Sequence, residues 1–315
     1  MWFKNAHLFC LTEPLSIDTG EFNQLLSKKP ARQCGNLERM TLGWGKLLEK
    51  ETDFEFCLQT EQCFLFALEK YEKILPQTVV RDHVADRVAE IEKQQDRSLG
   101  KREKRALMEE MLITLLPQAF SKRQRLHAYL DIKLGLLIVD TSSTTKAEEL
   151  VIFLKQTIPQ LKCQTVKVKR SVDYQLTDWL KNDTTPAGFQ IEDYVEFHDP
   201  DSAKTLIKCV NQNLYTPEIA AHLKAGKEVI KLGLSYKDRM AFIVDPELGI
   251  RKLEYLDEIN DQLEQVEIES RYEQLLTEFS LLSLELREML PKLFKAFGGL
   301  DLRQPKTEEL AQEPA

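Results

Sequence analysis

The stretch QTVVRDHVADRVAEIEKQQDRSLGKREKRALMEEMLITLLPQAF, residues 77–120, decides the architecture that we predict for this chain. Its first half carries aliphatic side chains at three- and four-residue spacing, namely Val80, Val84, Val88 and Ile91. This spacing predicts a helix over 77–95. After the break at Ser98-Leu99-Gly100, a second helix is predicted to end before Pro117, because proline cannot continue helical hydrogen bonding. Its apolar face consists of Leu107, Met108, Met111, Leu112 and Leu115.

Two helices joined by a short glycine-containing turn form an αα-hairpin. At 1.5 Å per residue each arm is roughly 25 Å long, so we expect the hairpin to project from the rest of the chain. On either side of it, strand patterns and helix patterns alternate irregularly, and pairs of strands joined by short turns dominate. The predicted fold class is therefore α+β, with antiparallel sheets and a projecting αα-hairpin, and not a doubly wound parallel sheet.

The expected organisation has four parts. They are the N-terminal part of a central α+β domain, the helical hairpin or tip region, the remainder of the central and base region, and a polar, disordered tail. Their ranges are 1–75, 76–125, 126–299 and 300–315. In the third part, we predict an antiparallel meander of strands over 228–235, 240–244 and 251–255, followed by a mostly helical segment over 258–290.

The composition is that of a soluble globular protein: of 315 residues, 43% are hydrophobic and 30% are charged. No apolar run approaches the ~20 residues that cross a bilayer, and the N-terminus lacks the features of a secretory signal. We therefore expect a cytoplasmic protein with no membrane partner. The six cysteines and five histidines are scattered without zinc-ligand spacing, so the cysteines are expected to be buried small hydrophobes and no metal site is predicted.

Few residues favour an enzyme. The sequence has no Gly-x-x-x-x-Gly-Lys-Ser/Thr loop, no Gly-x-Gly-x-x-Gly fingerprint and no Gly-x-Ser-x-Gly elbow. Asp131-Ile132-Lys133, with Glu69-Lys70 elsewhere, resembles the acid-x-lysine element of metal-dependent nucleases, although a hairpin edge with solvated charges is the simpler interpretation. We expect a non-enzymatic protein without a cofactor, and keep a nuclease that uses Asp131 and Lys133 as an alternative.

The formal net charge of −8 hides an uneven distribution. Residues 254–315 hold fifteen acids and six bases, a balance of −9, whereas residues 97–125 hold eight bases and three acids, a balance of +5. Residues 151–172 contain five bases and no acid. This polarity, more than the mean charge, bears on the choice of partner.

The first basic group surrounds Gly100 and consists of Arg97, Lys101, Arg102, Lys104 and Arg105. The last four lie at the start of the second helix, where the helix dipole disfavours a cation by about a few tenths of a kcal/mol. A phosphate backbone would offset this cost. A solvated turn is the bland alternative, and a turn that binds an acidic partner protein is a third interpretation.

Two further basic groups follow along the chain. They consist of Lys122, Arg123 and Arg125, and of Lys162, Lys167, Lys169 and Arg170. If the fold brings the three groups onto one concave face, the protein acquires a positive groove despite its acidic total. Aromatic residues do not interleave with these cations, so contacts with phosphate are expected in preference to base stacking.

Phe120 follows the helix terminator Pro117 and directly precedes the second basic group. It is either an ordinary core phenylalanine or an aromatic anchor for another subunit, since buried aromatic side chains dominate interface energetics.

Seven segments resemble, in the same order along the chain, the bacterial recombination-associated protein family RdgC. They are Met1–Asn5, Gly43-Trp44, Glu72–Pro76, Leu115–Ser121, Leu176–Leu180, Gly226–Val229 and the run from Leu232 through Arg239 to Phe242. The resemblance implies a ring-shaped homodimer that encircles double-stranded DNA without sequence preference, associates with the nucleoid, and restrains a RecA-type recombinase by occupying DNA. A ring with a positive lining and an acidic exterior would reconcile −8 overall with the local balance of +5.

The resemblance also implies DNA contacts outside the helical hairpin, from Lys208 and Gln212. The sequence departs from the family at two places: the charge expected near Asn211 is absent, and Gln118 stands where the family usually has arginine. Affinity is therefore expected to depend more on Lys227, Lys231 and the basic turn, with Phe120 at the dimer interface.

Overall fold

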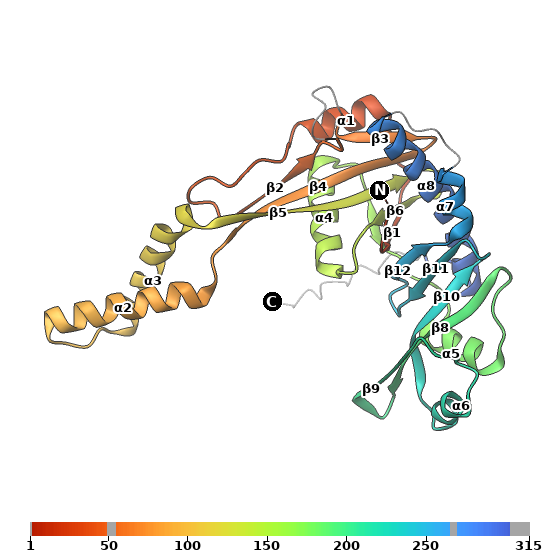
Figure 1. The fold of residues 1–315 in the computed structure, drawn as a ribbon. Helices are drawn as coiled ribbons and strands as arrows, with labels where there is room; N and C mark the ends of the chain where they lie inside the picture. The colour runs from red at the N-terminus through yellow and green to blue at the C-terminus, as the bar shows by residue number, and fades with distance from the viewer. Residues whose placement is uncertain (1, 49–54, 265–269, 303–315) are drawn as a thin grey trace, which may run out of the picture. The chain divides into compact units, whose positions relative to one another are not determined.

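The computed structural model describes residues 2–48, 55–264 and 270–302. The chain divides into two compact units, whose helices and strands are labelled in Figure 1. Unit 1 comprises residues 1–16, 59–64 and 129–315, and unit 2 comprises residues 17–58 and 65–128. The polar tail predicted over 300–315 lies outside the described residues from position 303 onward.

Unit 2 combines strands, one short helix and two long helices. Its strands follow one another in the order β2-β4-β5, and β2 pairs with β4 in antiparallel register. Two Phe–aromatic contacts join its core: the ring centroids of Phe22 and Trp44 lie 5.4 and 5.5 Å from that of Phe66, both edge to face. The elements are α1 (Thr19–Ser27), β2 (Met40–Gly45), β3 (Cys57–Thr60), β4 (Cys63–Ile74), α2 (Gln77–Gln95), α3 (Lys101–Leu115), the 3₁₀ turn η1 (Leu116–Gln118) and β5 (Phe120–Asp131).

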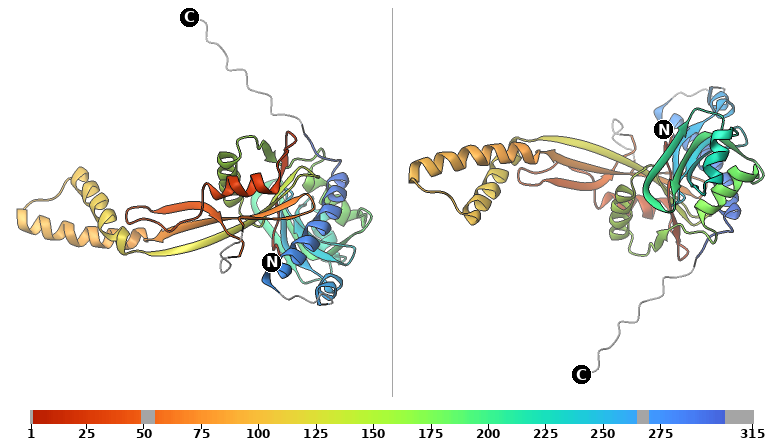
Figure 2. Two further views of the ribbon diagram at one scale, coloured as in Figure 1. Left: turned by 90° about the horizontal axis from the view of Figure 1, so that it is seen from above. Right: turned by 90° about the horizontal axis from the view of Figure 1, so that it is seen from below.

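Helices α2 and α3 are consecutive and contact each other, and the views from above and below show that they meet at an angle (Figure 2). Helix α2 ends at Asp96, which adopts a left-handed conformation with φ 47°, and Gly100 is the N-cap of α3. Val80 and Val84 are buried, whereas no residue of α3 is fully buried. The sequence pattern therefore predicted both helices with the right bounds. The apolar faces that the two helices turn toward each other are only partly buried.

Unit 1 contains two antiparallel groups of strands. Strands β6, β1 and β7, in that order and next to residues 129–131 at the end of β5, form one, and the five-stranded sheet β12-β11-β10-β8-β9 forms the other. The meander predicted over 228–255 is confirmed. The elements are β1 (His7–Leu11), β6 (Leu136–Val139), α4 (Thr144–Thr157), β7 (Cys163–Thr165), α5 (Val172–Asn182), β8 (Phe189–Asp199), β9 (Ser202–Val210), α6 (Pro217–Lys224), β10 (Glu228–Tyr236), β11 (Met240–Val244), β12 (Ile250–Tyr255), α7 (Asp257–Glu264) and α8 (Arg271–Ala296).

Helix α8 supplies much of the core of unit 1. It continues through Pro291 to Ala296, six residues beyond the end predicted at residue 290. Proline at this position removes one backbone donor, but Leu290, Leu293 and Phe294 around it are buried, so packing keeps the helix together. None of the helices in the described part of the chain is long and apolar enough to span a membrane.

The antiparallel sheets and the mixture of helix and strand agree with the predicted class. All six cysteines are free thiols, and the expectation of burial is confirmed for four, since Cys34 and Cys209 are only half-buried.

Candidate nucleic-acid interface

The turn between α2 and α3 is held by an arginine–carboxylate pair. The Arg97 guanidinium donates to both Glu103 oxygens, at 2.6 and 3.1 Å, and Glu103 also accepts the Gly100 N–H at 2.9 Å. The hydrogen bond from Arg97 lowers the pKa of the Glu103 carboxyl to about 2. Arg97, predicted to contact DNA, therefore closes its own turn.

Two other cations of this turn are also paired. The Lys104 ammonium lies 3.3 Å from Glu92, and Arg105 lies 3.5 Å from Glu109 one helical turn further on. Lys101 and Arg102 are exposed, and neither has a carboxylate partner within the described residues. The basic group thus separates into three paired cations and two that are available to an external anion.

The second basic group begins on β5, where side chains alternate between the two faces of the strand. Arg123 and Arg125 therefore share a face, and both reach the buried carboxylate of Glu69 on β4, at 2.5 Å each. Arg125 also donates to the Lys46 carbonyl at 2.7 Å. Burial alone raises the pKa of Glu69, but the hydrogen bonds from the two arginines outweigh it and hold that pKa below its ordinary value. Lys122 is exposed and carries no ion pair among the described residues.

A similar arrangement occurs in unit 1. The Lys231 ammonium of β10 lies 2.7 Å from the buried Glu196 carboxylate of β8, and Lys208 of β9 lies 3.6 Å from it. Tyr194 donates its hydroxyl to the same carboxylate at 2.5 Å. Burial raises the pKa of Glu196, and the hydrogen bond from Lys231 leads the interactions that lower it below its usual range. Lys252, which sequence reasoning did not single out, lies 5.5 Å from the Tyr194 ring.

The remaining predicted contacts in unit 1 are dispersed. Lys227 is largely buried and pairs with Asp199 at 3.1 Å, whereas Gln212 is exposed in the turn after β9. Lys162 pairs with Glu13 at 2.7 Å. Lys167, Lys169 and Arg170 are exposed.

Phe120 is 84% exposed at the first position of β5. This large apolar side chain is therefore not in the core of the chain, which contradicts the alternative that Phe120 is an ordinary core phenylalanine.

The Asp131 carboxylate of the nuclease alternative is 1% exposed and fully engaged. One oxygen accepts the Leu134 N–H at 2.9 Å, and the other pairs with the Arg287 Nε at 2.8 Å. Lys133 points to solvent from the turn that follows. Among the residues that the structure describes, no group of three or more His, Cys, Asp or Glu side chains is arranged to hold a metal ion.

Sequence reasoning named Glu69 only within the nuclease alternative and did not name Glu196, so it missed the role of both carboxylates in pairing these cations. Glu69 precedes Arg123 by 54 residues, and only strand pairing brings the two together. No local pattern marks Glu196 either, because its partners come from two different strands.

Comparison with known proteins accounts for nearly the whole chain. The family model described as "Putative exonuclease, RdgC" matches residues 1–300. The chain belongs to the RdgC family. Relatives named recombination-associated protein RdgC include those of Pseudomonas aeruginosa (strain LESB58), at 36% identity over 96% of this chain and 99% of that protein, and of Shewanella loihica, at 34% over 96% and 99%. The relative of Psychromonas ingrahamii is 34% identical over 95% of this chain and 99% of its own length.

The two departures from the RdgC pattern have clear places in the structure. Asn211 has φ 54°, a left-handed conformation that asparagine adopts more readily than most non-glycine residues. Gln118 is exposed in η1, two residues before Phe120.

Proposed function

We propose that this RdgC family member acts in recombination as a non-enzymatic protein that binds double-stranded DNA without sequence preference. The observation that carries the proposal is the first turn of α3, where Lys101 and Arg102 are exposed and have no ion pair within the described residues. Their position at a helix N-terminus is unfavourable for a cation in isolation, and a phosphate removes that penalty. The relatives' name, recombination-associated protein, agrees with this role.

Within the proposal, DNA contacts differ in kind. Lys101, Arg102 and Lys122 meet phosphate without first breaking an ion pair. Lys208 and Lys231 exchange part of their interaction with Glu196 for phosphate, so each contributes less. Phosphate contacts position a protein on the duplex and carry no sequence information, which is why binding is expected to be blind to sequence.

The proposed assembly is a ring-shaped homodimer in which α2, α3 and Phe120 form the tip. In a two-fold interface each copy offers the same surface, so Phe120 of one copy inserts into a site on the other. A pocket of ≈120 Å³ in unit 2, lined in part by Leu75, Val80, Met108 and Leu112, offers an apolar receptor of this kind. A closed ring on the nucleoid would restrain a RecA-type recombinase by occupying its DNA.

The test uses supercoiled plasmid and two end-labelled linear duplexes of unrelated sequence, incubated with the protein and Mg²⁺. Retarded migration of all three DNAs with similar affinity and no cleavage is the expected result. Discrimination between the two duplexes would contradict binding that is blind to sequence. Elimination of DNA binding by an acidic protein at equal charge would favour the third candidate, a protein-interaction module.

A nuclease is the second candidate, because the family description contains the word exonuclease. If the protein is a nuclease, the same mixture of protein, DNA and Mg²⁺ would yield shortened labelled strands or nicked plasmid. Asp131 is the acid that sequence reasoning assigned to it, and its two carboxylate oxygens already accept from the Leu134 N–H and pair with Arg287. The Lys133→Ala variant serves as the matched probe: loss of cleavage would support the nuclease, and unchanged DNA retardation supports the binding protein.

A further inference from the structure

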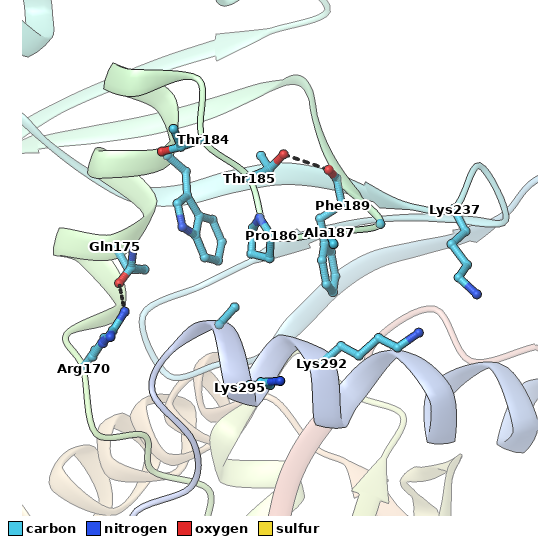
Figure 3. Close-up of a pocket in the computed structure, with 13 residues that line it drawn as sticks. Arg170, Gln175, Thr184, Thr185, Pro186, Ala187, Phe189, Lys237, Lys292 and Lys295 are labelled. Carbon is cyan, nitrogen blue, oxygen red and sulfur yellow. Dashed lines mark hydrogen bonds between the residues drawn. The ribbon is translucent and has the colours of Figure 1, made fainter.

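A separate basic site lies within unit 1, in a pocket of ≈690 Å³ (Figure 3). The loop of residues 184–188 forms one wall, and the last turns of α8 form the wall facing it. The volume falls in the range of pockets that bind small molecules.

Four cations from three separate segments line the pocket: Arg170, Lys237, Lys292 and Lys295. Figure 3 shows Arg170 on one side, Lys237 on the other, and Lys292 and Lys295 rising from the same helix. Lys292 and Lys295 are three residues apart on α8, so they share a face.

One carboxylate offsets only part of this charge. Glu288 accepts from Lys237 at 2.6 Å and from Lys292 at 2.8 Å, both at the same oxygen. Arg170 and Lys295 have no carboxylate partner within the described residues, and the nearest polar partner of Arg170 is the Gln175 side chain at 3.5 Å. The pocket therefore combines four positive charges with one negative charge.

The position of Arg170 is built into the fold. Its backbone N–H donates to the Phe297 carbonyl at 3.0 Å, and its side chain passes over Gly298. A Cβ at residue 298 would lie 3.0 Å from the Arg170 Cγ, and Gly298 has φ +85°. Glycine at this position thus lets the guanidinium stem lie against the backbone and face the pocket.

The other face of the pocket is apolar. Trp179 and Phe189 line it while remaining 3% exposed, so their rings are fixed by packing, and Pro186 extends this surface from the loop. The Trp179 ring packs on Phe297, with 5.0 Å between centroids. A ligand that satisfies both walls needs a compact group with several anionic oxygens and an attached flat, apolar ring.

We propose that this pocket binds a nucleotide, with its phosphates on Arg170, Lys295 and the Lys237–Lys292 pair, and its base against Pro186 and the aromatic wall. The side chains would replace the backbone amides of a glycine-rich loop, which the sequence lacks. A single concave pocket with clustered donors fits this ligand better than an extended acidic peptide, whose carboxylates are spread along a chain. The proposal does not depend on the binding of duplex DNA.

The test is isothermal titration calorimetry on the full chain without DNA, with ADP, pyrophosphate and adenosine as probes. We expect ADP to bind at one site and more tightly than either fragment. Arg170→Ala and Lys295→Ala should each weaken ADP binding about tenfold or more, because each removes a charge-assisted hydrogen bond. Lys169→Ala is the matched control, since it removes the same charge from an exposed neighbour that does not line the pocket.

Three results would overturn the proposal: no saturable binding of ADP, pyrophosphate binding as tight as ADP binding, or an equal loss in the Lys169→Ala control. Displacement of ADP by a polyglutamate peptide at the same concentration of carboxylate would assign the pocket to acidic peptides instead. Circular dichroism confirms folding. If Arg170→Ala proves unstable because of its packing on Gly298, Lys295→Ala alone decides.

Discussion

Replacing Phe120 by alanine isolates the proposed closure of the ring. The side chain is 84% exposed in the protomer, so nearly all of its apolar surface is available for burial by a partner. Full burial of a phenylalanine side chain stabilises by about 1.5–3 kcal/mol, and a two-fold contact uses two copies. When this value is scaled to the 84% of the side chain that is exposed and counted for both copies, the free energy of ring closure is weakened by about 2.5–5 kcal/mol in the variant. The fold of the protomer should lose less than about 0.5 kcal/mol, as is usual for an exposed position.

The assay compares dissociation from closed circular DNA and from linear DNA of the same length, with sedimentation to follow the dimer. A closed ring of two copies needs two interfaces, so the Phe120→Ala protein should remain mostly dimeric through the interface that does not contain Phe120. It should leave circular DNA much faster than the wild type does. Ile152→Ala is the matched control, because this α4 residue is 58% exposed and lies in unit 1. Unchanged residence on circles, an equal effect of the control, or a lowered melting temperature would each refute the reasoning.

Three further predictions concern the buried charges and one glycine. Glu69→Gln should destabilise the fold by about 2–3 kcal/mol at pH 7, at the lower edge of the usual cost of breaking a buried pair, because both arginines keep some solvent contact. Since the pKa of Glu69 is lowered in the folded state, the stability advantage of the wild type exists above the unfolded pKa near 4.5 and disappears as pH falls through the folded pKa. Urea unfolding at several pH values measures this dependence. Asp131→Asn should lower the stability measured by thermal unfolding by about 3–5 kcal/mol, because it leaves Arg287 without its buried partner. The folded variant should still retard DNA. A variant that loses DNA cleavage and keeps its stability would contradict this structural role of Asp131. Gly43→Ala should lower the melting temperature by several degrees, since the new Cβ would lie 2.4 Å from the Ala31 Cα; an unchanged melting curve would show that the 30–31 segment moves freely.

The helices of the opening stretch were predictable because their signals are local. Aliphatic spacing marked α2, and Gly100 and Pro117 bounded α3, so no distant residue was needed. The start of β5 was not predictable in this way. After the exposed Phe120, residues 121–123 are polar and exposed, and they form a strand because β4 provides a hydrogen-bonding neighbour.

Strands β2 and β8 were missed for related reasons. The stretch Met40–Gly45 contains two glycines, which are poor strand formers in isolation, but Gly43 allows the close approach of the 30–31 backbone. In Phe189–Asp199, charged residues interrupt the apolar pattern, and the buried Glu196 is tolerated only because two lysines and a tyrosine satisfy it.

The candidate site was predictable as a set of cations and not as an arrangement. Charge counting identified the basic group between the two helices, yet it assigned equal roles to Arg97 and Lys101. The structure separates them, because a carboxylate three residues after Gly100 binds Arg97 and leaves Lys101 exposed. Which cation is available depends on tertiary and turn geometry, and a composition cannot contain that information.

The salt dependence of duplex binding tests the central claim most directly. Affinity is measured over a series of salt concentrations for the wild type, for the double variant Lys101→Ala/Arg102→Ala, and for the matched control Arg97→Ala/Arg105→Ala, which removes two paired cations. Each phosphate neutralised contributes about −0.9 to the slope of log affinity against log salt, so the first variant should flatten the slope by about 1.8 and weaken unrelated sequences equally. The control should change it by much less. A wild-type slope in the Lys101→Ala/Arg102→Ala protein would contradict the proposal that this turn binds the DNA backbone.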